Sequence, residues 1–173
     1  MTLALISGSE QLIIADQVIL PGGLAGLGGV EHERTELFAG KLRYQDGCPP
    51  ASYDPLARGA LLDQWQVDQC VTFPTIGILP FPTDDLDLIS AYCRAYNTWQ
   101  AEFMQGLPNR IIAIAALNWR DVDAAVAELE RVIKLGFKGI VIPSNAPRGR
   151  RYSDDDYEPM WALAEEAGLP IAF

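Results

Sequence analysis

The side chains that most often hold metals or act as general bases are scarce in this sequence. It contains one histidine, His32. Metal hydrolases commonly take two or more ligands from histidine. A Ser-His-Asp arrangement would depend on His32 alone, which lies in a polar segment without a recognisable nucleophile motif. We therefore expect His32 to be an ordinary surface or loop residue. The residues predict no metal site in this chain and identify no catalytic residue.

The cysteines do not form a metal or redox motif. Cys48, Cys70 and Cys93 are odd in number and widely spaced, and no CxxC pair occurs. Cys70 and Cys93 lie in apolar patterns, as expected for buried thiols. Free thiols are typical of a reducing compartment, so the sequence favours a cytoplasmic location.

Polar side chains follow three of the predicted strands. Thr75, Asn118, Ser144 and Asn145 each come directly after a β-rich or apolar run, together with Phe73-Pro74, Trp119 and Pro143. In barrels of parallel strands, the pocket is built from residues at the carboxyl ends of the strands. We therefore consider these four residues substrate-pocket candidates. The alternative is turn formation and helix capping, which Asn, Ser and Pro perform routinely.

Arg148, Arg150 and Arg151 form a basic cluster after one of these strand ends. Arg148 is the candidate for binding a substrate carboxylate, because guanidinium and carboxylate groups pair in a bidentate manner. The alternative, which we favour, is a solvated loop whose arginines face Asp154–Asp156.

Composition excludes several partners. The formal net charge of −10 would repel a phosphate backbone or an anionic membrane surface. No apolar run approaches the roughly 18 residues needed to cross a membrane. The glycine-rich stretch Gly22–Gly29 lacks the GxxxxGK[ST] pattern and a strand–GxGxxG–helix arrangement, so it is expected to be a flexible loop.

Strand and helix patterns alternate from about Tyr53 onward. Helices are expected from Asp54-Pro55, from a Thr83 cap to near Gly106, over Asp121–Leu135, and from Pro159 to Gly168; strands are expected over 67–74, 110–117, 138–143 and 169–173. This order predicts an α/β fold, an incomplete (β/α) TIM-type barrel of about four to five βα units with parallel strands. Residues 1–52 are expected to hold one strand, Gln11–Leu20, and an irregular loop region, with the partial barrel over 53–173. Tyr92, Tyr96 and Trp99 are expected to pack in the core or between helices.

Four segments in this order resemble the amidohydrolase-related family of metal-dependent hydrolases and aromatic-acid decarboxylases. They are YDPLARGALLDQWQVDQCVTFPT, AYCRAYNTWQAEF, NRIIAIAALNWRDVDAAVAELERVIKLGFKGIVIPSN and DYEPMWALAEEAGLPIAF. The resemblance implies an N-terminal portion of an enzyme that acts on a small organic or aromatic acid. It also implies a divalent, zinc-like metal in complete family members, and a cofactor is not predicted for this chain.

The resemblance also shows where this sequence departs from the family. The first strand of the family ends in Asp-x-His or His-x-His, and the corresponding stretch here is Asp16–Pro21. Asp16 matches the acidic residue and is a further pocket candidate, but no histidine follows it. The next family histidine comes after the strand that begins here as Leu169–Phe173, so this chain alone is expected to be inactive.

Two hypotheses remain from the sequence. The chain is a portion of a hydrolase or decarboxylase whose completing segment supplies the remaining residues, or it is a non-catalytic, truncated half-barrel. The second hypothesis predicts self-association, because open strand edges favour pairing with another chain. The coding sequence directly after Phe173 would separate them: a continuation beginning with histidine supports the enzyme, and a stop codon supports the half-barrel.

Overall fold

The computed structural model describes residues 2–6, 8–14, 16–21, 43–44, 48–74 and 83–173. The chain forms two compact units, residues 1–61 with 81–83 and residues 62–80 with 84–173, and each is treated by itself. This division falls inside a helix, α3 (Pro55–Gln64). The boundary expected after residue 52 stays a prediction.

The first unit contains an antiparallel sheet of order β1-β2-β3, with β1 Thr2–Ile6, β2 Ser9–Ile14 and β3 Gln17–Pro21. The prediction of one strand over Gln11–Leu20 is therefore wrong. The chain reverses at Asp16, whose φ of 60° is left-handed. Asp is among the few residues that adopt this conformation readily. Leu12 and Ile14, two residues apart on β2, are buried, as expected for one face of a strand.

Helix α3 begins where the sequence predicts. The Asp54 Oδ1 atom accepts a hydrogen bond of 2.8 Å from the backbone N–H of Leu56, and Pro55 occupies the first helical position. Proline suits that position because its missing N–H would have no partner within the helix. A short 3₁₀ turn, Pro50–Ser52, precedes the helix.

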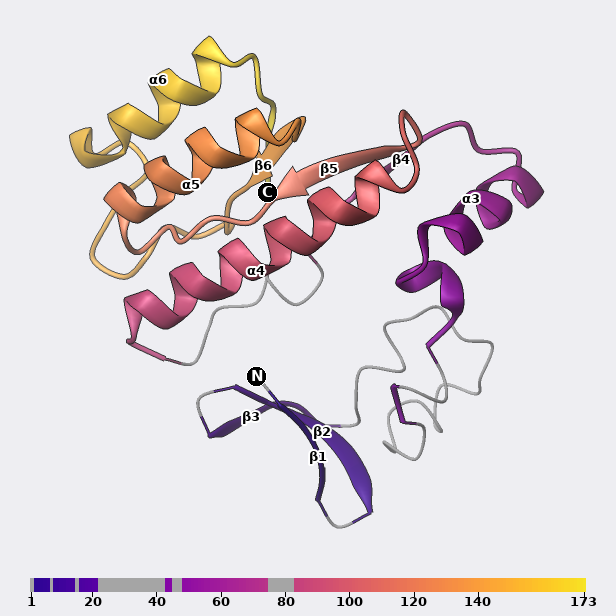
Figure 1. The fold of residues 1–173 in the computed structure, drawn as a ribbon. Helices are drawn as coiled ribbons and strands as arrows, with labels where there is room; N and C mark the ends of the chain where they lie inside the picture. Colours follow the sequence, from indigo (N-terminus) through magenta and orange to yellow (C-terminus); the bar gives the residue numbers. More distant parts are fainter. Residues whose placement is uncertain (1, 7, 15, 22–42, 45–47, 75–82) are drawn as a thin grey trace. The chain divides into compact units, whose positions relative to one another are not determined.

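The second unit is a parallel sheet whose strands lie side by side in chain order, β4 Cys70–Thr72, β5 Ile111–Ala115, β6 Gly139–Val141 and β7 Ile171–Ala172. Helices α4 Leu86–Gln105, α5 Val122–Lys134 and α6 Glu158–Glu166 connect successive strands. Figure 1 shows these three helices next to one another in the same order. The predicted succession of parallel βα units is confirmed.

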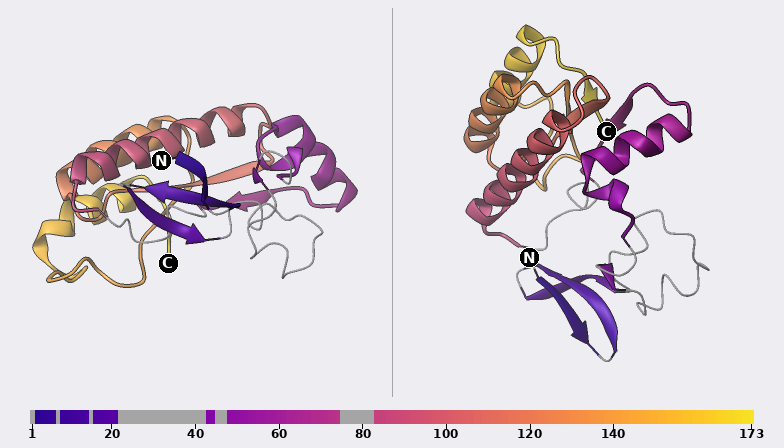
Figure 2. Two further views of the ribbon diagram at one scale, coloured as in Figure 1. Left: turned by 90° about the horizontal axis from the view of Figure 1, so that it is seen from below. Right: turned by 45° about the vertical axis from the view of Figure 1, so that its right-hand side comes forward.

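All three connecting helices cover one face of this sheet. Ala113, Ala115 and Ile140 of the strands lie in one buried cluster with residues of the helices, including Leu129 and Met160. The left view of Figure 2 shows the helices on one side of the strands. A doubly wound sheet would carry helices on both faces, whereas a barrel carries them on its outside only. The arrangement is that of a partial TIM-type barrel, as the sequence predicts.

Acidic side chains begin the connecting helices. The Asp85 Oδ1 atom accepts from the N–H of Leu88 at 3.0 Å, so the cap of α4 is Asp85, and the prediction of Thr83 is wrong by two residues. Asp85 directly precedes the helix, so its carboxylate reaches the N–H of the third helical residue, where the helix dipole also favours a negative charge. The Asp121 cap of α5 is confirmed, with a 3.1 Å bond from the N–H of Ala124.

Gly139 allows β6 to lie close to its neighbouring strands. A Cβ atom at this position would be 2.7 Å from the Ile114 Cδ1 atom and 3.1 Å from the Pro170 carbonyl oxygen.

We expect Gly139→Ala to lower the free energy of unfolding by about 1–3 kcal/mol, because an added side-chain atom in a packed core forces its neighbours to move. Urea unfolding followed by tryptophan fluorescence measures this change. Gly106→Ala is the matched control, because Gly106 is exposed and has a φ of −68° that alanine adopts easily. Equal stability of Gly139→Ala and the wild type would contradict the expectation.

Candidate functional site

The carboxyl ends of β5 and β6 bring several predicted site residues to one edge of the sheet. Asn118 follows β5, and Ser144, Asn145 and Arg148 follow β6, which is the next strand in the sheet. Thr75 lies outside the described residues. Asp16 lies in the hairpin turn of the first unit, where antiparallel strands give no shared carboxyl edge. A pocket role for either of these two residues stays a prediction.

Asn118 uses its amide within the fold. Asn118 is only 3% exposed. Its Nδ2 atom donates to the Leu86 carbonyl oxygen at 3.0 Å and to the Ser90 Oγ atom at 2.9 Å. Its Oδ1 atom accepts from the N–H of Arg120 at 3.2 Å. Both amide hydrogens are thus engaged. Asn118 ties the end of β5 to the start of α4, which favours the capping alternative for this residue.

The loop after β6 presents exposed polar side chains. Ser144, Asn145 and Arg148 are all exposed. No hydrogen bond or ion pair involves the Arg148 guanidinium among the residues that the structure describes.

The other two arginines of the cluster contact the acidic stretch Asp154–Asp156, Arg150 through its side chain and Arg151 through its backbone. The Arg150 Nη1 atom lies 3.7 Å from the Asp156 Oδ2 atom, and its guanidinium lies over the Tyr157 ring, 5.9 Å from the centroid. The backbone N–H of Arg151 donates to the Asp154 Oδ2 atom at 2.7 Å. The Asp154–Asp156 stretch thus engages the Arg150 guanidinium and the Arg151 backbone, and among the described residues the guanidinium groups of Arg148 and Arg151 make no hydrogen bond or ion pair. Of these two arginines, Arg148 lies nearer in the chain to the end of β6 and stays the candidate for a ligand.

A buried polar network supports the end of β5. The Asn97 Nδ2 atom donates to the Ala116 carbonyl oxygen at 2.9 Å and to the Glu128 Oε1 atom at 2.8 Å, while its Oδ1 atom accepts from the Ala116 N–H at 3.0 Å. Arg131 donates to both Glu128 carboxylate oxygens, at 2.8 and 2.6 Å. The hydrogen bond to Glu128 raises the pKa of Arg131. Asn97 is fully buried, and its hydrogen bonds to Ala116 hold the backbone just before Asn118.

Sequence reasoning missed the roles of Asn97 and Gln100. The Gln100 Nε2 atom donates to the Thr72 Oγ1 atom of β4 at 2.8 Å, so α4 holds β4 and β5 through polar side chains. One signal was present: two amide residues three positions apart on the same helical face as Cys93 and Ala101. Buried amides need partners, and here these are strand groups.

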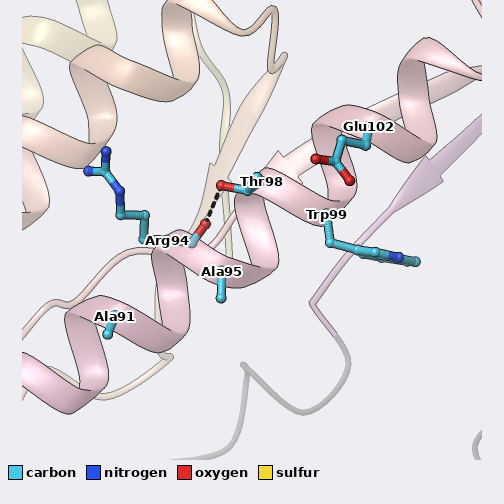
Figure 3. Close-up of a pocket in the computed structure, with 6 residues that line it drawn as sticks. All are labelled: Ala91, Arg94, Ala95, Thr98, Trp99 and Glu102. Atoms are coloured by element: carbon cyan, nitrogen blue, oxygen red, sulfur yellow. Dashed lines mark hydrogen bonds between the residues drawn. The ribbon is translucent and has the colours of Figure 1, made fainter.

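The outer face of α4 has a shallow hollow lined by Ala91, Arg94, Ala95, Thr98, Trp99 and Glu102 (Figure 3). All of its lining comes from one helix, and the Thr98 hydroxyl donates to the Arg94 carbonyl oxygen within that helix. We therefore do not regard it as the site. Trp99 is 41% exposed but packs against Phe103 and Tyr96, with centroid distances of 5.3 and 6.2 Å. The expected packing of the α4 aromatic residues is thus partial.

Residues 49–173 match the sequence model of the Amidohydrolase family. The chain belongs to this family. The matched range covers the four-stranded sheet and all its helices, so it contains the edge described above.

The curated relatives that this chain matches are decarboxylases. It is 39% identical over 82 residues to Decarboxylase orsB of Emericella nidulans, covering 46% of this chain and 24% of that protein. It is 33% identical over 84 residues to the gamma-resorcylate decarboxylase of Rhizobium radiobacter, covering 45% of this chain and 26% of the relative. The chain thus spans about a quarter of the length of each relative. The resemblance to amidohydrolase-related decarboxylases is confirmed.

Solved structures show the same fold. The 5-carboxyvanillate decarboxylase of Novosphingobium aromaticivorans, with bound manganese and a nitrobenzoic acid, superposes with a TM-score of 0.57 at 27% identity, covering 66% of this chain and 32% of that one. An amidohydrolase of Mycobacterium avium subsp. paratuberculosis has a TM-score of 0.71 at 24% identity, covering 98% of this chain and 50% of that one. The family is therefore metal-dependent. The metal in the first structure is manganese, where the sequence led us to expect a zinc-like ion.

The described residues of this chain do not fit a metal by themselves. No group of three or more His, Cys, Asp or Glu side chains converges within the part of the chain that the structure describes. His32 lies outside that part. We accordingly assign no metal-dependent step to this chain's residues.

No helix among the described elements of this chain is long and apolar enough to cross a membrane. The cytoplasmic location inferred from the cysteines stays a prediction.

Proposed function

We propose that this chain supplies the first strands, and the loops after β5 and β6, of a decarboxylase barrel acting on a small aromatic acid. The observation that carries the proposal is the identity of 39% to a decarboxylase over 82 residues of this chain. The geometry supports it, because the barrel edge where pockets form carries an exposed Arg148 without a partner among the described residues.

Decarboxylation of an aromatic acid needs a site that binds the carboxylate anion and a group that donates a proton. Decarboxylation of an aromatic acid breaks the bond from ring carbon to carboxylate, releases CO₂ and places a proton on that carbon. Arg148 can pair with the carboxylate or with a phenolate oxygen through two parallel N–H groups. The exposed side chains of Ser144 and Asn145 can donate to the remaining oxygens. These residues bind and orient the substrate, and the proton donor is left to the completing part of the barrel.

The face of the four-stranded sheet opposite the helices carries exposed apolar side chains that a completing segment could cover. Val71 and Phe73, which alternate with the helix-facing Thr72, are 49% and 43% exposed. Exposed apolar side chains on a strand face usually mark a surface that another element covers. We propose that further barrel strands cover it. The alternative function, a non-catalytic half-barrel, assigns that cover to a second copy of this chain.

A paired activity and mass measurement tests the proposal. The chain alone, and the chain extended by the coding sequence that follows it in its gene, are incubated with Mn²⁺ and 2,6-dihydroxybenzoate, and CO₂ release is measured. We expect turnover from the extended protein only. In the extended protein, Arg148→Ala should lower kcat/KM about 10- to 100-fold, because the substrate loses a contact to a charged side chain. Arg150→Ala is the control, since Arg150 already pairs with Asp156.

Two outcomes would overturn the proposal. One is an extended protein that hydrolyses amides and releases no CO₂ from aromatic acids. The other is a chain that forms a defined dimer in sedimentation while the extended protein lacks both activities, which would support the half-barrel.

A further inference from the structure

Four aromatic residues pack together beside the ends of β5 and β6. Trp119, Tyr152, Tyr157 and Trp161, called here the aromatic cluster, have every pair of ring centroids between 5.6 and 6.3 Å apart. Trp119 stacks on Trp161, and Tyr152 meets three of its neighbours edge-on. Packed aromatic pairs stabilise one another beyond the effect of burial, so the cluster supports the segments that carry it.

Hydrogen bonds hold the aromatic cluster together and join it to the end of β6. The Trp119 Nε1 atom donates to the Val141 carbonyl oxygen at 3.0 Å, and the Tyr157 hydroxyl donates to the Trp119 carbonyl oxygen at 3.0 Å. The Trp161 Nε1 atom donates to the Tyr152 carbonyl oxygen at 3.1 Å. The position of the Tyr152 ring is therefore fixed from three sides.

The Tyr152 hydroxyl makes a different contact, to the loop that carries the candidate site. It lies 2.7 Å from the Pro143 carbonyl oxygen and 3.3 Å from the Asn145 carbonyl oxygen. These two carbonyls flank Ser144. Burial raises the pKa of Tyr152 to about 12, so its hydroxyl remains a donor at neutral pH.

We propose that Tyr152 is a positioning residue: its hydroxyl, held by the aromatic cluster, fixes the loop after β6 so that Ser144, Asn145 and Arg148 face an aromatic acid in one arrangement. This proposal rests on the function proposed above. Tyr152 touches the loop backbone and acts on a ligand only through it. It links the polar loop to the ends of two adjacent strands.

The hydroxyl matters because, among the described residues, the backbone of 143–149 has one other hydrogen bond, and the contacts of Arg150 and Arg151 with the acidic stretch lie after it. Arg150 donates its N–H to the Pro147 carbonyl oxygen at 2.9 Å, a contact within the loop. The Pro143 and Asn145 carbonyls are near the surface, so water can replace Tyr152 as their donor. Removing the hydroxyl should therefore loosen the loop without unfolding the sheet. Ordering of a binding loop before the ligand arrives lowers the cost of binding.

Limited trypsin digestion of Tyr152→Phe tests this in the chain itself. We expect cleavage after Arg148 to become about 5- to 10-fold faster, because the loop opens more often while the phenylalanine ring still packs. Cleavage after Arg131 and Lys134 in α5 serves as the internal measure of global unfolding. Tyr157→Phe is the matched control: it removes a hydroxyl from the same cluster that bonds Trp119 and not the loop. Its cleavage after Arg148, relative to α5, should equal that of the wild type.

A second measurement separates positioning from simple structural support. In the extended protein with 2,6-dihydroxybenzoate, Tyr152→Phe should raise KM about 10-fold and change kcat by less than about 3-fold. Wild-type cleavage after Arg148 in Tyr152→Phe would overturn the proposal, and so would a faster cleavage with an unchanged KM. If no protein turns over an aromatic acid, the proposed function fails, and faster loop cleavage in Tyr152→Phe alone would still support the loop restraint.

Discussion

Replacing Asn97 by leucine should lower the free energy of unfolding of the second unit by about 2–4 kcal/mol, the range expected when buried donors and acceptors lose their partner. Asn97 is 0% exposed, and its amide bonds both the N–H and the carbonyl of Ala116. Leucine has a similar shape but offers no polar atom. Both Ala116 groups would then be buried without a partner, and the Glu128 carboxylate would lose one donor.

Urea unfolding followed by tryptophan fluorescence measures this loss. All four tryptophans of the chain, Trp65, Trp99, Trp119 and Trp161, belong to the second unit, so the signal reports on that unit. Thr98→Ala is the control on the same helix. The Thr98 hydroxyl is exposed and bonds only the Arg94 carbonyl oxygen, so its change should stay within about 0.5 kcal/mol. Equal stability of Asn97→Leu and wild type would mean that the Ala116 groups find other partners.

The elements of the second unit could be predicted because their signals are local. Helix α5 shows this best: Asp121 caps it, its apolar residues recur every three or four positions, and Gly136 follows it with a φ of 89°. Each of these features depends only on residues close together in the chain, so each can be recognised from the sequence. The strands between helices then follow from apolar runs, and their parallel order follows from the connections.

The hairpin of the first unit could not be predicted in the same way. Its turn at Asp16 interrupts an apolar run without a glycine or proline to mark it. Strand β2 pairs with β1 and β3, and pairing between strands depends on residues far from the turn. The shift by two residues at the start of α4 has a similar origin, since Thr83 and Asp85 are both acceptable caps by residue type.

The edge of the sheet that carries the candidate residues could be predicted from the sequence, while the contacts of these residues could not. Parallel strands end at a shared edge, so Asn118 and Ser144 were expected near one another. That Asn118 is bound by Leu86 and Ser90 depends on how α4 lies against β5. Similarly, Arg148 and Arg150 are alike in the sequence, and only the fold gives Arg150 an acidic partner. Tertiary contacts thus decide which polar residues remain available to a ligand.

Alkaline pH should destabilise the second unit through Cys93. Burial, with a further contribution from the negative charge of Glu128, raises the pKa of the Cys93 thiol from its ordinary value of 9.0 to about 12. The folded state therefore favours the neutral thiol. Its contribution is fully present below pH 9 and is lost as the pH rises through about 12, because the unfolded chain ionises first. Each pH unit in that window costs about 1.4 kcal/mol, which gives roughly 2.5 kcal/mol by pH 11.

The comparison of wild type with Cys93→Ala, both kept reduced, isolates this effect. At pH 7 the variant should be less stable by about 1–2 kcal/mol, because Cys93 is 2% exposed and its removal leaves a small cavity. Between pH 9 and pH 11 the wild type should lose about 2.5 kcal/mol more than the variant, so that the two stabilities converge or cross. Burial also raises the pKa of Tyr92 and Tyr96, but both proteins share these tyrosines and the difference cancels them. Parallel pH profiles would show that the Cys93 thiol ionises alike in the folded and unfolded chain, and that the helix-facing side of the sheet admits water beside α4.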